Sequence, residues 1–289
     1  MSLRILILSE NRPTGFSGGR YHVLMMAMAL SAAGHEVVYQ TNTRPAFLPD
    51  FEGHDGFYGI DWRVAEAFAP LGGERFDAVI LAPGRQFRSD LYFTARATVL
   101  RDEAELFLIN FESANWYNSV SPTKRDAREW AHWKDAMSIG GTILSSANES
   151  ERWAQKFYPK HCRHAVWSPP IHARAADQAA VVQREKRIAL ITRFDDAHKG
   201  SERIEALLPE EARGYTLALM TASQVSTEDE AGLRKRLSER GVDLDLIRAP
   251  VETEKFAELK RAKAMIFPSR FEGYGLPPIE ALYCGAEVA

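Results

Sequence analysis

The chain has 289 residues, of which 45% are hydrophobic and 26% are charged, and its formal net charge is −3. This composition excludes a disordered chain and is sufficient for about two globular domains. The small net charge gives no electrostatic reason to expect a nucleic-acid partner. Two cysteines, Cys162 and Cys284, are too few for a disulfide framework, so we expect reduced thiols in a cytoplasmic protein.

The N-terminal apolar run of about five residues is far shorter than the roughly 20 residues that span a bilayer. We therefore expect no membrane crossing. Residues 121–136 are basic and amphipathic, which allows at most weak contact with a membrane surface. Their mixed charge favours a solvated helix face instead.

In the first half of the chain, short apolar runs alternate with amphipathic stretches. Most of the runs lack a period of two, which is typical of parallel strands buried on both faces. The clearest helix covers residues 19–33 and ends at Gly34, a residue suited to a helix C-cap. The expected strands are residues 4–8, 36–41, 77–82, 106–111, 142–146 and 165–167.

The pattern pauses near residues 168–184, where a Pro-Pro pair and small polar residues are typical of a linker. It resumes with expected strands at residues 187–192, 215–220, 243–248 and 264–267, and helices at 201–208, 227–240 and 252–262. The alternation predicts an α/β protein with two Rossmann-like, doubly wound parallel-sheet domains. Their expected bounds are residues 1–168 and 186–289, with a linker at 169–185.

A glycine-rich segment follows the first expected strand and leads into the first helix. It places backbone amides at a helix N-terminus, where an anion or a closely approaching substrate can bind. Gly15, Gly18 and Gly19 do not match the dinucleotide fingerprint, and the second strand ends at Asn42 without an acid for a ribose. A binding role for Gly18 and Gly19 and a simple loop turn are equal alternatives.

Two cations follow the first strand of the second domain. Arg193 would lie just past the carboxyl end of that strand, where open α/β sheets bind ligands, and Lys199 would begin the next helix. A guanidinium can bridge two oxygens while an ammonium acts as a point charge, so the pair suits a diphosphate. Beside Asp195 and Asp196, a solvated charged turn is the more frequent alternative.

Near the end, the chain reads FEGYGLPPIEALYCG from position 271 to 285. The two prolines predict a helix from about Pro277, with Leu276 extended as its N-cap. Because prolines lack N–H groups, an anion would have to use the amides of residues 273–276, where glycines permit close approach.

Two carboxylates, Glu272 and Glu280, lie eight positions apart in this stretch. Carboxylates repel phosphate, so in a nucleotide-sugar site they would accept hydrogen bonds from hydroxyl groups. The alternative needs no ligand: Glu280 caps the helix while Ile279 and Leu282 pack on its core face.

Residues 271–285 resemble the Glu-x7-Glu signature of retaining GT-B glycosyltransferases, and are most similar to family four. The other matches follow the family's order along essentially the whole chain, more weakly across residues 42–76 and 111–134. They are Gly18-Gly19, Gly34-His35, Arg193, Lys199-Gly200 and Pro268-Ser269.

The resemblance implies a hexosyltransferase that moves a sugar from a nucleotide diphosphate sugar to a hydroxyl of a saccharide, lipid or small-molecule acceptor. It implies a front-face mechanism with retention and without a metal or cofactor. By this resemblance Arg193 and Lys199 hold the donor diphosphate, Glu272 holds the transferred sugar and Glu280 takes the ribose hydroxyls. Further implied donor contacts are Gly273, Tyr274, Gly275, Leu276, Arg248 and Ala249.

The chain departs from the family pattern in two places. Many members have a His shortly after the fourth strand of the first domain, whereas this chain has polar residues and a Trp on that expected acceptor side: Asn110, Glu112, Asn115 and Trp116. Family members also continue for several more strands and helices, so we expect a truncated second domain whose last strand, at 286–289, has an exposed edge.

Tryptophans could stack on an acceptor sugar. Trp130, Trp133 and Met137 have helical spacing, which favours a core position. For Trp116, a core position and a role in sugar binding are both open. Two other function classes also stay open. A non-catalytic nucleotide- or sugar-binding protein would explain the missing His. A dinucleotide-dependent oxidoreductase or epimerase fits the fold alone.

Overall fold

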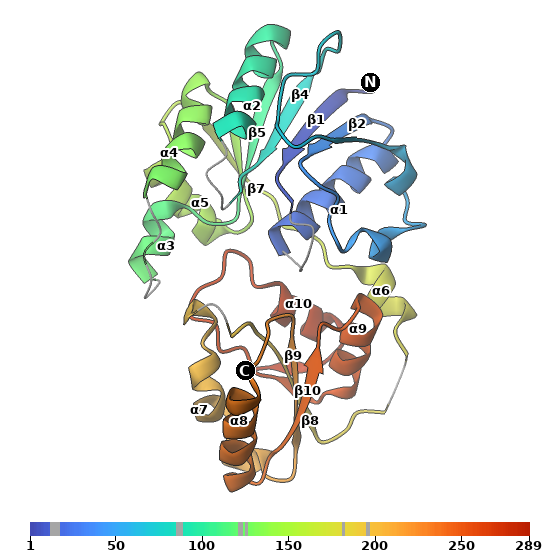
Figure 1. Cartoon of the computed structure of the whole chain (residues 1–289), viewed down its shortest axis with the longest axis vertical. Helices are drawn as coiled ribbons and strands as arrows, with labels where there is room; N and C mark the ends of the chain where they lie inside the picture. The colour runs from blue at the N-terminus through green and yellow to red at the C-terminus, as the bar shows by residue number, and fades with distance from the viewer. Residues whose placement is uncertain (12–17, 85–88, 121–123, 125–126, 181–182, 195–196) are drawn as a thin grey trace. The chain divides into compact units, whose positions relative to one another are not determined.

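The computed structural model describes the chain except residues 12–17, 85–88, 121–123, 125–126, 181–182 and 195–196. The chain divides into two compact units. Unit 1 comprises Met1–Ser119 and Lys124–Pro170, and unit 2 comprises Ile171–Ala289 with the short segment Val120–Thr123. Each unit contains a parallel sheet covered by helices, which confirms the predicted pair of doubly wound α/β folds (Figure 1).

Unit 1 has a seven-stranded sheet in the order β3-β2-β1-β4-β5-β6-β7. Its central strand β1 pairs in parallel with β2 on one side and β4 on the other, so that Leu6 lies opposite Val38 and Val79. The strands are β1 (Arg4–Ser9), β2 (Glu36–Thr41), β3 (Ile60–Val64), β4 (Ala78–Ala82), β5 (Glu105–Asn110), β6 (Thr142–Ser145) and β7 (Arg163–Val166).

Six of these strands were predicted and β3 was missed. Its sequence, IDWRV, fully buries only Ile60, leaves Trp62 half-buried and exposes the other three residues. An edge strand pairs on one side and is partly solvated, so it does not need the apolar run that identifies a central strand.

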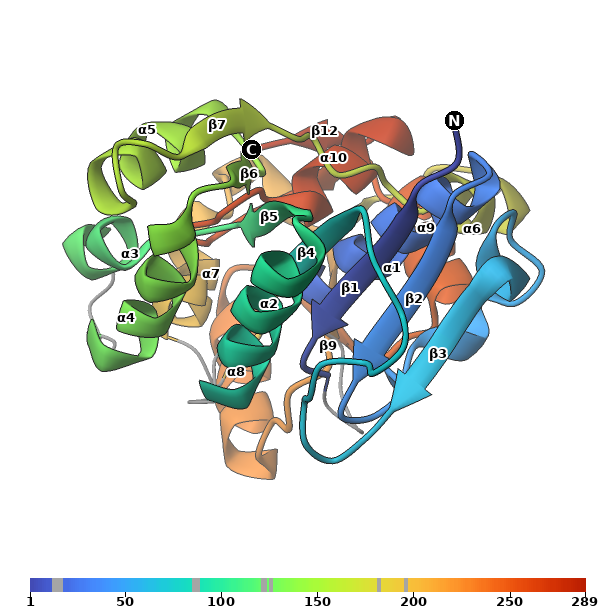
Figure 2. The same cartoon turned by 90° about the horizontal axis from the view of Figure 1, so that it is seen from above.

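Helices cover both faces of the unit 1 sheet, with α1 and α2 on opposite faces (Figure 2). The helices are α1 (Gly18–Ala32), α2 (Ser89–Asp102), α3 (Ala114–Val120), α4 (Ala127–Ala136) and α5 (Asn148–Phe157). The predicted C-cap of α1 is confirmed, since Gly34 has a φ of 88° and its N–H donates to Ser31. The N–H of His35 donates to Leu30, which completes a Schellman motif.

The aromatic residues Trp130 and Trp133, together with Met137, are buried in unit 1. The two indole rings lie 4.4 Å apart between centroids. The prediction that these residues form core rather than a binding surface is confirmed. The proposed membrane-surface segment, residues 121–136, falls partly outside the described residues.

Unit 2 has a five-stranded parallel sheet in the order β10-β9-β8-β11-β12. The strands are β8 (Arg187–Ile191), β9 (Thr216–Thr221), β10 (Asp243–Arg248), β11 (Ala264–Met265) and β12 (Glu287–Val288). The helices are α6 (Ala173–Gln178), α7 (Ile204–Leu207), α8 (Thr227–Glu239), α9 (Glu252–Arg261) and α10 (Leu276–Tyr283). Helix α6 lies within the segment expected as a linker and packs against α9.

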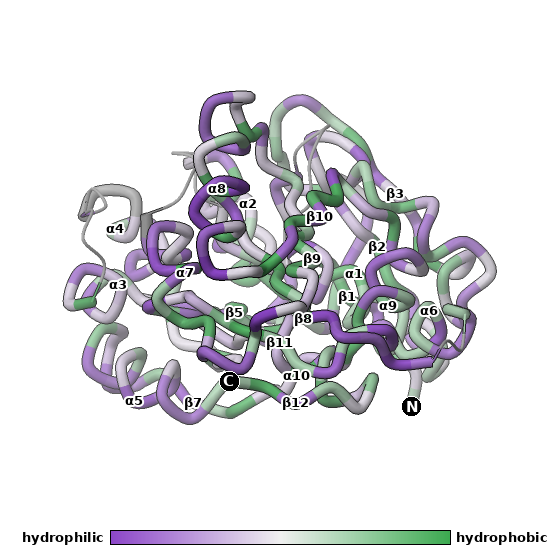
Figure 3. Tube along the Cα trace, turned by 90° about the horizontal axis from the view of Figure 1, so that it is seen from below, coloured by the Kyte–Doolittle hydropathy of each residue, from purple (hydrophilic) through white to green (hydrophobic). Residues whose placement is uncertain are grey.

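Alternating residues of the unit 2 strands enter two separate hydrophobic clusters. Ile188 and Leu190 pack with α7 and α8 on one face, whereas Ala189 packs with α6, α9 and α10 on the other. Side chains alternate across a strand, so a strand covered on both faces needs apolar residues at every position. Figure 3 shows the resulting contrast between hydrophobic strands such as β9 and the largely hydrophilic α8.

Candidate functional site

The order of the unit 2 sheet places two loops at one edge. Strand β8 continues to β9 on one side and has β11 as its other neighbour, so the order reverses between β8 and β11. Open α/β sheets bind ligands at the carboxyl ends of the strands at such a reversal. Arg193 and Lys199 follow β8, and Glu272 follows β11. The sheet therefore brings these three predicted residues to the carboxyl ends of β8 and β11, a place we call the β8/β11 edge.

Backbone contacts hold the two loops together. Gly200 has a φ of 67°, and a Cβ atom there would lie 2.2 Å from the carbonyl oxygen of Pro268. The N–H of Arg270 also donates to the carbonyl of His198 at 2.8 Å. Only glycine combines this left-handed conformation with so close an approach. The close approach of Gly200 to Pro268 therefore links the Lys199-Gly200 and Pro268-Ser269 pairs structurally.

The ammonium of Lys199 donates to Glu272 within this edge. Its Nζ lies 2.5 Å from Oε1 of Glu272, and the hydroxyl of Ser269 donates to the same oxygen at 2.6 Å. Both charged side chains are about one-fifth exposed. An incoming anion can therefore reach Lys199, but it must compete with Glu272. The sequence predicted roles for these two residues without predicting that they pair.

Helix α10 begins at Leu276, so the prediction that Leu276 is an extended N-cap is wrong. The N-cap is Gly275, whose φ of 78° suits a glycine. Leu276 is buried on the helix face that also carries Glu280, four residues later. The prolines occupy the next two helical positions, where a missing N–H leaves no intrahelical bond unmade.

Glu280 is buried rather than solvated, with 1% of its surface exposed. Its Oε1 accepts a hydrogen bond from Nζ of Lys255 at 2.7 Å, and Lys255 also donates to Glu252 at 2.9 Å. Nδ1 of His172, the residue before α6, lies 3.6 Å from Glu252. The alternative in which Glu280 caps α10 while Ile279 and Leu282 pack is wrong for Glu280 and Leu282, because Glu280 bonds to Lys255 and Leu282 is 60% exposed. Ile279 is half-buried.

Two carboxylates compete for one buried ammonium in this cluster. Burial raises the pKa of Glu280 to about 7, against the opposing pull of Lys255. Burial also acts to raise the pKa of Glu252, but His172 and Lys255 outweigh it and lower that pKa. Burial disfavours the charge of Lys255, yet Glu280 and Glu252 raise its pKa overall. Glu280 is thus the carboxylate that takes up a proton first.

Two other predicted donor contacts lie at the end of β10, with β9 between that strand and β8. Arg248 forms an ion pair with Glu230 of α8 and is largely exposed. Ala249 has a φ of 45°, an uncommon conformation for a residue with a Cβ atom. Of the contacts predicted around α10, Gly273 and Tyr274 are half-buried.

The predicted residues of unit 1 are mostly engaged within the fold. Gly18 and Gly19 begin α1, and a Cβ atom on Gly19 would lie 3.2 Å from the ring of Phe111, so this glycine has a packing role. Gly15 lies outside the described residues.

Four predicted residues lie at or after the end of β5. The amide of Asn110 is fully buried and donates to the hydroxyls of Ser145 and Ser150. Trp116 is also buried. Glu112 and Asn115 are half-buried, and the amide of Asn115 donates to the backbone of Trp153. Glu112 and Asn115 are therefore more exposed than Asn110 and Trp116.

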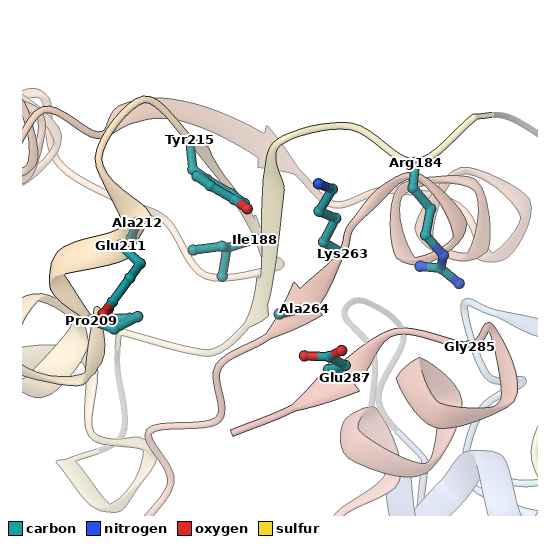
Figure 4. A pocket seen from close by; sticks show the side chains of 10 residues that line it. All are labelled: Arg184, Ile188, Pro209, Glu211, Ala212, Tyr215, Lys263, Ala264, Gly285 and Glu287. Carbon is teal, nitrogen blue, oxygen red and sulfur yellow. The ribbon is translucent and has the colours of Figure 1, made fainter.

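A pocket of about 530 Å³ opens at the opposite edge of the unit 2 sheet (Figure 4). It is lined by residues at the amino ends of the strands, including Ile188 of β8, Ala264 of β11 and Glu287 of β12. Its charged side chains are of both signs, for example Arg184 and Glu211. None of the predicted donor residues lines it, so it is separate from the β8/β11 edge.

No protein-family model matches the chain, and no curated protein matches it in sequence. Sucrose-phosphate synthase from Thermosynechococcus elongatus superposes with a TM-score of 0.68 at 14% identity, over 99% of this chain and 80% of that one. HepE of Anabaena, in complex with UDP and glucose, superposes with a TM-score of 0.66 at 12% identity, over 99% of this chain and 80% of that one.

The fold is that of GT-B glycosyltransferases. The catalytic domain of starch synthase IV from Arabidopsis thaliana, bound to ADP and acarbose, shares it with a TM-score of 0.61 at 14% identity, over 100% of this chain and 82% of that one. In the described part of the chain, no helix is both long and apolar enough to cross a membrane. Among the same residues, no group of three or more His, Cys, Asp or Glu side chains could hold a metal ion.

Sequence reasoning missed the cluster around Lys255. The one signal in the sequence was that Lys255 precedes Phe256 in α9. Phe256 and Leu259 mark the buried face of this helix. A lysine in that pattern usually lies at the rim of the buried face with its ammonium in water. Its burial depends on α6 and α10, which come from elsewhere in the chain.

Proposed function

We propose that the chain is a retaining hexosyltransferase that takes its sugar from a nucleotide diphosphate sugar and needs no metal ion. One observation carries the proposal: two cations and a carboxylate from different loops meet at the β8/β11 edge, with Lys199 and Glu272 in contact. The shared fold supports it, since structures with this fold bind UDP with glucose and ADP with acarbose.

In this proposal Arg193 and Lys199 bind the donor diphosphate. Arg193 lies two residues beyond β8 and Lys199 ends the following 3-10 turn. A guanidinium and an ammonium together offset the charge that develops on the leaving nucleoside diphosphate. The amides of residues 273–276, which precede and begin α10, donate to the same phosphates or to the transferred sugar.

Glu272 and Glu280 bind hydroxyl groups of the donor. Glu272 accepts hydrogen bonds from the transferred sugar, and Glu280 accepts them from the ribose. Because Glu280 is buried, binding must uncover its second oxygen, Oε2. Arg248 and Ala249 contact the base in this proposal.

The reaction proceeds on one face of the sugar. The bond between the anomeric carbon and the phosphate oxygen breaks, and a bond from the same carbon to the acceptor oxygen forms. The acceptor proton passes to the departing phosphate oxygen, so no side chain acts as the base. The transition state resembles an oxocarbenium ion, and the protein contributes positioning and fixed charges.

The acceptor binds on the side of unit 1 that carries Asn110, Glu112, Asn115 and Trp116. In this proposal Glu112 and Asn115 make the polar contacts, because they are more exposed than the other two. The acceptor is a saccharide, a lipid or a small molecule with a free hydroxyl, and any membrane contact is weak.

A second candidate is a nucleotide- or sugar-binding protein without catalysis. It is favoured by the sequence after β5, which has no His between Asn110 and Val120. The test incubates the chain with UDP-, GDP- and ADP-sugars and measures release of the nucleoside diphosphate. Release that is lost in Arg193→Ala but kept in Lys235→Ala, an exposed lysine of α8, supports the transferase. Binding without release from any donor supports the second candidate instead.

A further inference from the structure

Four charged or titratable side chains form one buried cluster in unit 2: His172, Glu252, Lys255 and Glu280. They come from the residue before α6, from α9 and from α10. Each is less than one-tenth exposed. Of the four, only Glu280 has a part in the proposed function.

Lys255 is the central member of this cluster. Its ammonium donates to Oε1 of Glu280 at 2.7 Å and to Oε2 of Glu252 at 2.9 Å. On the far side of Glu252, the ring of His172 lies 3.6 Å away. The contact with Lys255 occupies one oxygen of Glu280 and restrains the carboxylate through it.

Stability alone does not explain a buried lysine at this position. The neighbouring buried residues of α9, Phe256 and Leu259, pack in an apolar cluster with α6 and α10. Replacing a buried ion pair by apolar residues of similar size is often neutral or stabilising, because both charges must be removed from water. A role in positioning the carboxylate of Glu280 explains why the fold tolerates the cost of removing these charges from water.

We propose that Lys255 is a positioning residue for the nucleotide ribose. It fixes Oε1 of Glu280 and favours the carboxylate form, which leaves Oε2 for the ribose hydroxyls once binding uncovers it. Glu252, with His172 behind it, holds Lys255 in place. This inference rests on the proposed function, since it takes the ribose role of Glu280 from there.

The charges of the cluster support this role. The pKa of Glu280 is raised to about 7, and Lys255 is the group that acts to lower it. Without the ammonium, Glu280 would be protonated at neutral pH and would no longer be an acceptor at both oxygens. The groups that face Glu280 are Lys255 and Glu252 of α9 and Cys284, four residues along α10, with His172 behind Glu252.

Two consequences distinguish positioning from simple packing. Affinity for a nucleoside diphosphate should rise with pH as Glu280 loses its proton. The preference for ribose over 2′-deoxyribose should depend on Lys255, because only a carboxylate held in place gains a hydrogen bond from the 2′-hydroxyl. A hydrogen bond to a charged group accounts for about tenfold in affinity.

The experiment measures binding of UDP, GDP and ADP, and of their 2′-deoxy forms, by calorimetry from pH 5.5 to 8.5. For the nucleotide that binds, we expect the ribose form to bind about tenfold more tightly than the 2′-deoxy form in the unaltered chain. In Lys255→Met this ratio should approach one, and the midpoint of the pH profile should move up. Lys255→Arg should restore most of the preference. Lys260→Met, which removes a lysine of α9 bonded to the backbone of Ala179, is the matched control and should change neither quantity.

Glu252→Gln provides an independent variant if Lys255→Met fails to fold. It removes the carboxylate that competes with Glu280 for the ammonium, so the midpoint of the pH profile should move down, opposite to Lys255→Met. An unchanged ribose preference in Lys255→Met, or an unchanged or raised midpoint in Glu252→Gln, overturns the inference and leaves the proposed function intact. If the unaltered chain binds no nucleoside diphosphate, the proposed function fails and this inference fails with it.

Discussion

The ammonium of Lys199 lies 2.5 Å from a carboxylate oxygen of Glu272, although 73 positions separate the two residues in the sequence. Strands β8 and β11 are neighbours in the sheet, and Gly200 lets the loops after them approach each other. In the structure Glu272 offsets the charge of Lys199. A donor diphosphate would take the place of Glu272 beside Lys199. The first two predictions follow from this exchange.

Lys199→Ala should lower kcat/KM for the donor by about a hundredfold, as removal of one charge-stabilising group commonly does. Lys199→Arg should keep part of the activity, because it keeps the charge without the compact shape of an ammonium. Release of nucleoside diphosphate measures both, with Lys235→Ala as the control. Activity of Lys199→Ala within twofold of the unaltered chain would remove Lys199 from the donor site.

Glu272→Gln should separate binding from turnover. The substitution frees Lys199 from its internal ion pair, so free nucleoside diphosphate should bind a fewfold more tightly. Transfer should be slower, because the sugar loses a charged hydrogen-bond acceptor. Calorimetry and steady-state rates measure the two effects, and weaker binding of the nucleoside diphosphate would contradict the prediction.

Gly200→Ala should destabilise unit 2 by about 2–4 kcal/mol. The new Cβ would lie 2.2 Å from the carbonyl oxygen of Pro268, and a φ of 67° costs a residue with a Cβ atom about 1 kcal/mol by itself. Gly214→Ala is the matched control, since its φ is 78° but no atom lies within 4 Å of its Cβ. Urea denaturation compares them, and equal losses would show that the close approach does not matter.

Glu280 should make stability depend on pH near neutrality. The folded chain keeps a proton on Glu280 up to about pH 7, the raised pKa, whereas the unfolded chain releases it near the usual glutamate pKa of 4.5. Between these values the folded state binds more protons, so the free energy of unfolding should fall as pH rises. Relative to Glu280→Gln, the loss between pH 5 and pH 8 should be about 2.5 kcal/mol. A difference between the two chains that stays constant across this range would argue against a raised pKa.

Transfer should persist after treatment with EDTA, because Arg193 and Lys199 supply the positive charge in the proposed mechanism. The measurement compares donor turnover before and after dialysis against the chelator. Loss of activity that Mg²⁺ restores would show that a metal ion takes part.

Most of the fold could be predicted from the sequence, because strands and helices depend on local patterns. The bounds of β2 and β10 were predicted to the residue, and the glycine at position 34 marked the end of α1. The missed strand β3 lies at a sheet edge, where burial is too small to leave an apolar run. Helix α6 was missed because its short, alanine-rich sequence depends on packing against α9.

The sequence by itself determined the order of strands and helices and the presence of cations and carboxylates in the loops that follow β8 and β11. Parallel pairing brings those loops to one edge, so the topology alone predicts that Lys199 and Glu272 are near each other. Only the tertiary structure decided that Glu280 faces inward and that Lys255 meets it. The direction of a helix face depends on the elements packed against it, and α6, which packs with α9 and α10, is distant from both in sequence. The charge of a buried side chain depends on the same packing, because its neighbours replace the water that would otherwise solvate it.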